Sequence, residues 1–153
     1  MSQPIDFTPA SRVVLSQARR EAADLGHEIV GTEHVLLALL NVEDPALTTT
    51  FANLELNPAV VRGTTLTMLG IPPEAQVTEH AAALGDVPEL PFTRRMKDAI
   101  EWAMREAMEF NAGRVSSSNL LLGLLREGEG VAATALARSG VTIEKARDAS
   151  RDH

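Results

Sequence analysis

The sequence predicts an all-α protein, and three observations support this fold class. Aromatic residues make up only 3% of the chain, so the core must be built from Leu, Val, Ile, Ala and Met. Among these residues, Ala, Leu and Met are strong helix formers. Apolar residues recur at helical spacing, and no segment alternates apolar and polar residues for long, as a half-buried strand would. The helical pattern also occurs twice.

The two copies of the pattern are 85 residues apart. Phe7 and Thr8 match Phe92 and Thr93, and two leucine-rich runs match at the same offset. Between the copies lies a stretch with four prolines, four acidic residues and no Lys or Arg, which is typical of an exposed linker. We therefore expect one domain over residues 1–153, with repeat one at about 7–70, the linker at about 71–91 and repeat two at about 92–149.

The first helix of each repeat begins at a threonine. Thr8 and Thr93 are favourable N-caps, because their hydroxyls accept a hydrogen bond from the first turn, and Pro9 suits the first helical position. Gly26 supplies the left-handed residue that commonly ends a helix. The apolar face of this helix holds Val14, Ala18, Ala22 and Leu25 in repeat one, and Ile100, Ala103, Ala107 and Phe110 in repeat two.

The second helix of each repeat is expected to begin with Thr32 or Ser117 as its N-cap. It carries the leucine run Leu36–Leu40 in repeat one and Leu121–Leu125 in repeat two. Apolar residues surround nearly the whole circumference of this helix. We therefore expect it to be buried in the middle of the domain.

A short third helix and a last helix complete each repeat. A turn at residues 43–45 or 128–130 precedes the third helix, which holds Phe51 or Leu136. The last helix begins near Asn57 or Thr142, because both residue types are suitable N-caps. Each repeat therefore consists of four helices, and no part of the sequence predicts a strand.

Composition and charge argue against several classes of function. The net charge is −7, whereas a surface that binds nucleic-acid phosphates needs clustered Lys and Arg. The chain has no cysteine, which removes disulfides and zinc–thiolate sites. No apolar run is long enough to span a membrane, and the first residues lack the features of a signal peptide. We expect a cytoplasmic protein without nucleic-acid or membrane partners.

Four sequence patterns together resemble the Clp N-terminal repeat domain. These are the Phe-Thr start of each copy, the A-x-x-E-A of the first helix, G-T-E-H at residues 31–34 and R-E-G-E-G-V-A-A at residues 126–133. The resemblance covers residues 7 to about 149 and is closest to the ClpC branch. It implies two four-helix repeats related by a pseudo-two-fold axis. It also implies a domain that docks substrates and adaptor proteins for ClpC- and ClpA-type AAA+ unfoldases and their protease.

The unfoldase motor itself has no counterpart in the sequence. The chain contains no G-x-x-x-x-G-K-[ST] loop and no Gly–Lys pair, so we expect neither ATPase activity nor a cofactor. The chain is then either the N-domain of an unfoldase or a stand-alone Clp-N protein. A stand-alone protein would act as an accessory subunit of a Clp complex or as a competitor for its ligands.

The resemblance also implies a ligand, phosphoarginine. In similar ClpC domains the Glu of G-T-E-H engages the guanidinium, and the threonine at the start of each first helix lies near the phosphate. The matching residues are Glu33, Thr8 and Thr93. Carboxylates do pair with guanidinium groups, and helix N-termini bind phosphate. Ser118 stands at the second Glu position, so we expect one of the two sites to be lost or altered, because a hydroxyl supplies no charge.

Glu33 and His34 have two other interpretations. In the simpler one, Thr32 caps the helix, Glu33 stabilises its positive end and His34 packs at the edge. In the other, a small hydrolase would use Glu33, His34 and His27. The spacing does not bring a nucleophile, a base and an orienting group together, and the four histidines give no metal-ligand triad. We expect neither catalysis nor a metal.

Three aromatic residues are candidates for partner binding. Phe7 and Phe92 precede the helix starts, where they would fix the entry of the chain. The resemblance implies that Phe92 lies where cyclic-peptide antibiotics dock. Trp102 lies on the flank of its helix, where packing is favoured over a role as partner anchor. The acidic turn at residues 126–129 is expected to be solvated.

Overall fold

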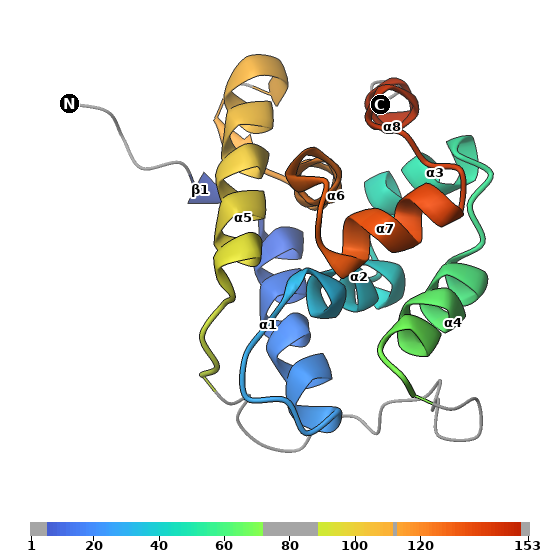
Figure 1. The fold of residues 1–153 in the computed structure, drawn as a ribbon. Coiled ribbons are helices and arrows are strands. Elements are labelled where there is room, and N and C mark those ends of the chain that lie inside the picture. Colours follow the sequence, from blue (N-terminus) through green and yellow to red (C-terminus); the bar gives the residue numbers. More distant parts are fainter. Residues whose placement is uncertain (1–5, 72–88, 112, 151–153) are drawn as a thin grey trace.

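The protein was examined as a computed structural model, which describes residues 6–71, 89–111 and 113–150. Within these residues the chain forms two similar groups of four helices (Figure 1). The all-α fold class is confirmed. The predicted linker lies mostly outside the described residues. Repeat one contains α1 (Pro9–Asp24), α2 (Thr32–Asn41), α3 (Pro45–Asn53) and α4 (Pro58–Met68), and repeat two contains α5 (Arg94–Glu106), α6 (Ser117–Glu127), α7 (Val131–Arg138) and α8 (Ile143–Ser150).

The first helices begin as the sequence predicts. The Thr8 hydroxyl accepts a hydrogen bond from Ser11 N–H and caps α1, and the Thr93 hydroxyl caps α5 in the same way. Helix α1 ends before Gly26, whose φ is 76°. Helix α5 instead continues into one turn of π-helix at Ala107–Asn111. The two repeats therefore share their helix starts and differ in how their first helices end.

The predicted N-caps of the second helices are wrong by one residue. Helix α2 begins after Gly31, whose N–H donates to the ring of His34 at the third helical position, as in the reverse half of a capping box. Helix α6 begins after Ser116, whose hydroxyl accepts the N–H of Asn119. Thr32 is consequently free to interact elsewhere in the domain.

Two short strand pairings correct the expectation that the chain has no strand. Strand β1 (Asp6–Phe7) runs parallel to β2 (Arg114–Val115), and a single bridge joins Val30 to Phe92. Two-residue strands are too short to leave an alternating pattern in the sequence. Each pairing joins the segment before the first helix of one repeat to the segment before the second helix of the other. The two pairings therefore follow the pseudo-two-fold axis.

The core lies around α2 and α6, as their apolar circumference predicts. Three leucines of each helix are fully buried. Helix α6 approaches α5 closely, because a Cβ atom at Gly123 would lie 2.3 Å from the carbonyl oxygen of Ala99. Buried leucines of these two helices include Leu36, Leu37, Leu39, Leu120, Leu121 and Leu124.

Each repeat also buries a glutamate from its first helix. Glu21 pairs with Arg62 of α4 at 3.2 Å, with side chains only 6% and 10% exposed. The equivalent Glu106 pairs with Arg147 of α8 at 2.6 Å and with Arg126 of α6 at 2.9 Å. Burial of a carboxylate needs such partners, because an unpaired charge in the interior is costly. These ion pairs connect the first helix of each repeat to the last.

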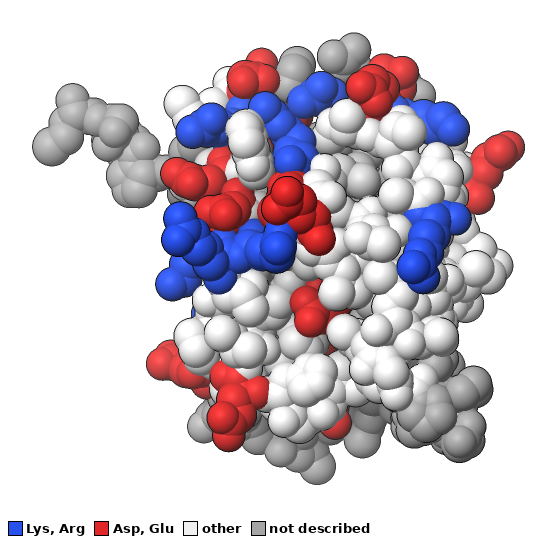
Figure 2. All heavy atoms as spheres, in the orientation of Figure 1, with Lys and Arg blue, Asp and Glu red and all other residues white. Residues whose placement is uncertain are grey.

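Charged residues are unevenly distributed over the surface. Figure 2 shows them gathered beside α5, while the face over α7 is largely uncharged. The sequences agree, since α3 has no charged residue and α7 has only Arg138. Among the described residues, no helix combines the length and apolar character needed to cross a membrane.

Candidate functional site

The candidate residues form two equivalent sites, and each site combines the two repeats. Thr8 N–H donates to the Val115 carbonyl at 3.0 Å, and Thr93 N–H donates to the Val30 carbonyl at 2.8 Å. Thr8 therefore lies beside the segment that leads to Ser118. Thr93 lies beside the segment that leads to Glu33. We call these the Thr8 site and the Thr93 site.

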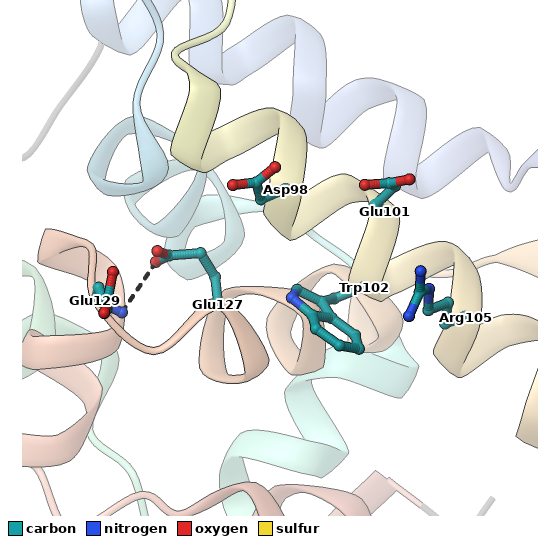
Figure 3. Close-up of a pocket in the computed structure, with 6 residues that line it drawn as sticks. All are labelled: Asp98, Glu101, Trp102, Arg105, Glu127 and Glu129. Carbon is teal, nitrogen blue, oxygen red and sulfur yellow. Dashed lines mark hydrogen bonds between the residues drawn. The ribbon is translucent and has the colours of Figure 1, made fainter.

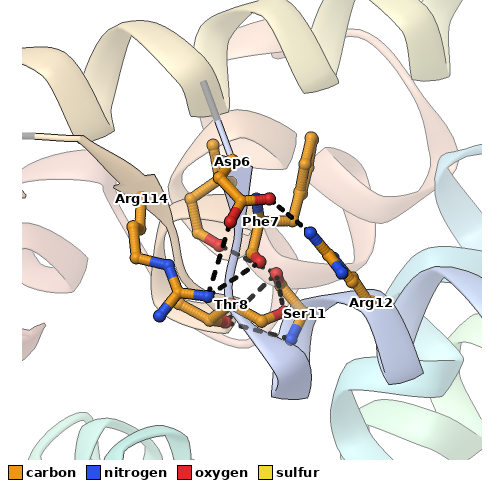
Figure 4. Close-up of polar contacts among 7 residues, drawn as sticks. Asp6, Phe7, Thr8, Ser11, Arg12 and Arg114 are labelled. Carbon is orange, nitrogen blue, oxygen red and sulfur yellow. Dashed lines mark hydrogen bonds and ion pairs between the residues drawn. The ribbon is translucent and has the colours of Figure 1, made fainter. Parts of the chain in front are cut away.

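The Thr8 site contains a closed network of hydroxyls (Figure 4). The Thr8 hydroxyl accepts Ser11 N–H at 3.2 Å and donates to the Ser11 hydroxyl at 3.1 Å. Ser11, which is fully buried, has carbonyl acceptors at Thr8 and Val115. The hydroxyls of Thr8 and Ser11 and the Ser11 N–H are therefore satisfied within the protein.

Surface charges around the Thr8 site also pair with one another. Asp6 pairs with Arg12, and Arg114 lies 3.7 Å from the same carboxylate and donates to the Phe7 carbonyl at 3.3 Å. The hydrogen bond from Arg12 is the main cause that lowers the pKa of Asp6, and Arg114 adds to it. The single Asp6 carboxylate therefore lies against both arginines.

The Ser118 side chain at the Thr8 site points into the protein. It is 8% exposed, and its hydroxyl lies 3.4 Å from the Thr50 hydroxyl of α3. Nothing at position 118 presents a negative charge to the surface. The Thr8 site therefore has the helix start but lacks a carboxylate from α6.

The Thr93 site is built on the same backbone with different side chains. Thr93 accepts Met96 N–H at 3.1 Å, and the buried Met96 replaces Ser11, so the hydroxyl network is absent. Phe92 is half-buried, and the guanidinium of Arg19 lies 4.8 Å from its ring centre. Phe7 of the other site is likewise half-buried against the core. Both rings pack at helix starts, and each keeps part of its surface exposed.

Glu33 gives the Thr93 site its negative charge. It is the second residue of α2, and its carboxylate folds over Gly31, where a Cβ atom would lie 2.1 Å from Oε1. A side chain at position 31 would therefore displace the Glu33 carboxylate. Glu33 makes neither a hydrogen bond nor an ion pair with the described residues. A half-buried carboxylate at the positive end of a helix is thus left available to a ligand.

His34 follows Glu33 in the chain and forms a hydrogen-bonded pair with His27. His34 is 2% exposed, and its Nδ1 accepts Gly31 N–H at 2.9 Å. The proton of the neutral ring must therefore be on Nε2, which donates to Nδ1 of His27 at 2.8 Å. Burial, with His27 as a second cause, lowers the pKa of His34 from 6.5 to about 4, although Glu21 opposes the shift.

This geometry bears on the hydrolase and metal interpretations. Both ring nitrogens of His34 are occupied, so neither is free to take a proton from a substrate or to bind a metal. Among the described residues there is no group of three or more His, Cys, Asp or Glu that could hold a metal ion. The hydrogen bonds of His34 instead serve the start of α2.

Trp102 packs between two arginines. The guanidinium carbons of Arg105 and Arg126 lie 4.8 Å and 4.2 Å from its ring centre. Beside the indole is a hollow of about 320 Å³, in which acidic side chains predominate (Figure 3). Both arginines lie within the distance at which a cation is attracted to an aromatic ring. Lining residues are Asp98, Glu101, Trp102, Arg105, Glu127 and Glu129.

The turn after α6 is less solvated than its sequence indicates. The Glu127 side chain is 5% exposed, and it accepts Gly130 N–H at 2.7 Å and pairs with Arg95 at 3.2 Å. Glu129, by contrast, is 77% exposed. Thr32 of repeat one also accepts Ala132 N–H at 3.3 Å. The start of α7 is therefore capped by Glu127 of α6 and by Thr32 of the other repeat. The contact with Thr32 leaves no pattern in the sequence around residues 126–129.

Comparison with known sequences gives a consistent family assignment. The Clp repeat (R) N-terminal domain matches residues 6–86 and 91–153. The negative regulator of genetic competence ClpC/MecB of Bacillus subtilis is 36% identical over 141 residues, which cover 92% of this chain and 16% of that protein. The ClpC ATP-binding subunit of Staphylococcus saprophyticus is 34% identical over 145 residues, with the same coverage. The chain thus spans about one sixth of the length of these relatives.

Solved structures support the same fold. The N-terminal domain of ClpD from Arabidopsis thaliana superimposes with a TM-score of 0.68 at 21% identity, covering 97% of this chain and 95% of that domain. The Hsp104 N-terminal domain of Candida albicans gives a TM-score of 0.69 at 14% identity, with 96% and 90% covered. With both repeats matched and both relatives above 30% identity, the chain belongs to the Clp repeat N-terminal domain family.

Proposed function

We propose that this chain is a non-catalytic recognition module of a Clp unfoldase system and that its Thr93 site binds phosphoarginine-marked substrates. The observation that carries the site proposal is the Glu33 carboxylate, which lies at the start of α2 without a partner among the described residues. Membership in the Clp family supports the wider role in docking substrate or adaptor proteins.

The two ends of phosphoarginine have suitable partners at this site. The Glu33 carboxylate would accept hydrogen bonds from the guanidinium, and charge-assisted pairs of this kind are strong. Thr93 caps the Met96 N–H, while the N–H groups of Arg94 and Arg95 have no acceptor within α5 and favour a phosphate. Arg94 and Lys97 in the first turns of α5 are exposed and add positive charge there. The site therefore offers opposite charges to the two ends of the ligand.

The same reasoning predicts that only one site is active. At the Thr8 site, Ser118 is buried against Thr50, and Asp6 already occupies Arg12 and Arg114. A guanidinium would find no free carboxylate from α6 there. We therefore propose a stoichiometry of one phosphoarginine per chain.

A calorimetric titration with free phosphoarginine tests the proposal. Wild type should bind at a single site, and Glu33→Gln should weaken binding more than tenfold, because loss of a charged hydrogen-bond partner costs about 1.5–3 kcal/mol. Glu144→Gln, an exposed change of the same kind on α8, should bind as wild type does. Absence of binding by wild type would refute phosphoarginine recognition. Protein docking through exposed parts of Phe92 and neighbouring helix faces would then remain as the proposed role.

A further inference from the structure

The start of α2 carries a chain of hydrogen bonds that forms only when the rings of His27 and His34 are both neutral. Gly31 N–H points at Nδ1 of His34, so Nδ1 must carry a lone pair. Nε2 of His34 lies 2.8 Å from Nδ1 of His27, so one proton is shared between these two nitrogens. The chain of hydrogen bonds runs from the backbone of α2 through a buried ring to an exposed one.

Adding a proton to either ring breaks this chain. If His34 gains a proton on Nδ1, two N–H groups face each other at Gly31. If His27 gains one on Nδ1, two N–H groups face each other between the rings, unless His34 moves its own proton to Nδ1 and again loses Gly31. A proton on His34 Nδ1 therefore removes the capping hydrogen bond of α2 directly, whereas a proton on His27 removes it only through the change of tautomer in His34. An exposed histidine is thus coupled to a buried helix cap.

We infer that protonation of the His27–His34 pair opens the N-terminal cap of α2 and thereby weakens ligand binding at Glu33. Glu33 is close to this hydrogen bond, because its carboxylate folds over Gly31 and the Gly31 N–H donates to the ring of His34. Opening the cap moves the backbone that positions this carboxylate. The effect on the ligand rests on the proposed function, whereas the opening of the cap does not.

The surrounding charges do not replace the lost bond. Glu21 of α1 faces the pair, but its carboxylate is engaged by Arg62 of α4 and Asn41 of α2. Burial of the ring disfavours a charge on His34, and a charge on His27 would act in the same direction. The closed cap therefore excludes the proton, and the open cap accepts it.

Hydrogen exchange at the Gly31 amide measures this opening without any ligand. With the pKa of His34 at about 4 in the closed form and an ordinary 6.5 in the open form, the opening equilibrium should rise about tenfold between pH 7.5 and 5.5. After correction for intrinsic exchange rates, the protection of Gly31 should fall by that factor. His34→Gln is the matched variant, because its amide keeps an acceptor for Gly31 and a donor for His27 but does not titrate.

Two measurements then separate the possible failures. We expect wild type to lose Gly31 protection and phosphoarginine affinity together as the pH falls, and His34→Gln to lose neither to the same extent. Equal protection of Gly31 at pH 7.5 and 5.5 in wild type, with the fold intact by circular dichroism, would overturn the inference. The same loss of protection in His34→Gln would overturn it as well. Loss of Gly31 protection without ligand binding at any pH would instead support cap opening and refute the proposed ligand.

Discussion

At the scale of single residues, His34 makes the stability of the domain depend on pH. The folded state holds its pKa at about 4, below the ordinary 6.5, because the ring is buried. As the pH falls below 6.5, the unfolded chain binds a proton that the folded chain does not, so stability is lost on acidification. This contribution is complete above pH 6.5 and decreases until about pH 4.

The predicted loss is measurable by urea denaturation. Between pH 7 and 5 the free energy of unfolding should fall by about 2 kcal/mol through His34, on top of any loss caused by carboxylates. His34→Gln should lack this part of the decrease, so the difference between the two proteins isolates it. Parallel pH profiles for wild type and His34→Gln would contradict the burial of a neutral imidazole.

Glu21 provides a second test at this scale. Both members of the Glu21–Arg62 pair are nearly buried, and removing one leaves the other charge in the interior. We expect Glu21→Gln to destabilise the domain by about 3 kcal/mol in urea denaturation. Arg12→Gln breaks an ion pair whose side chains are more than half exposed, and it should change stability little. If both variants lost similar stability, the buried pair would not be a major contributor.

At the scale of helices, α7 depends on a residue from the other repeat. The Thr32 hydroxyl accepts Ala132 N–H at 3.3 Å, and this N–H has no acceptor within its own helix. Thr32→Val keeps the shape of the side chain and removes the hydroxyl. We expect a loss of about 1 kcal/mol in the free energy of unfolding, since capping substitutions cost about 0.5–2 kcal/mol.

Repeat two supplies the control for the Thr32→Val experiment. Ser117 occupies the position of Thr32 in repeat two, and its buried hydroxyl finds no hydrogen-bond partner within the described ranges. Ser117→Ala should therefore leave stability nearly unchanged. If Thr32→Val were as harmless as Ser117→Ala, the hydrogen bond between the repeats would contribute nothing measurable.

The helices were predictable to the extent that their determinants are local. Thr8, Thr93 and Asn57 act as caps because each hydrogen-bonds to its own helix. Thr32 was wrong as the cap of its own helix, because its hydroxyl accepts the Ala132 N–H of the other repeat, a contact that depends on how the chain folds back. Glu127 was expected in a solvated turn, but it accepts the Gly130 N–H before the next helix. Sequence spacing does not show which of several polar groups will reach a helix end.

At the scale of the whole molecule, the duplication predicts the architecture but not the composition of its sites. The resemblance supplied Glu33, Thr8 and Thr93 as a set. Only the parallel pairings of residues 6–7 with 114–115 and of Val30 with Phe92 bring Thr93 beside the segment that leads to Glu33. These contacts join segments that are distant in sequence, and they leave no periodic pattern. The symmetry of the backbone is retained, while the substitution of Glu by Ser at position 118 makes the two sites chemically different.

The central claim is that one of two symmetric sites recognises phosphoarginine, and a nitrogen-15 NMR titration tests it most directly. Adding phosphoarginine to the labelled domain at pH 7.5 should shift amide resonances of residues 31–33 and 93–95, with a single-site dependence on concentration. Amides of residues 8, 10, 11 and 116–118 should change little. Equal shifts at both sets of residues, or none at either, would contradict a single Glu33-based site.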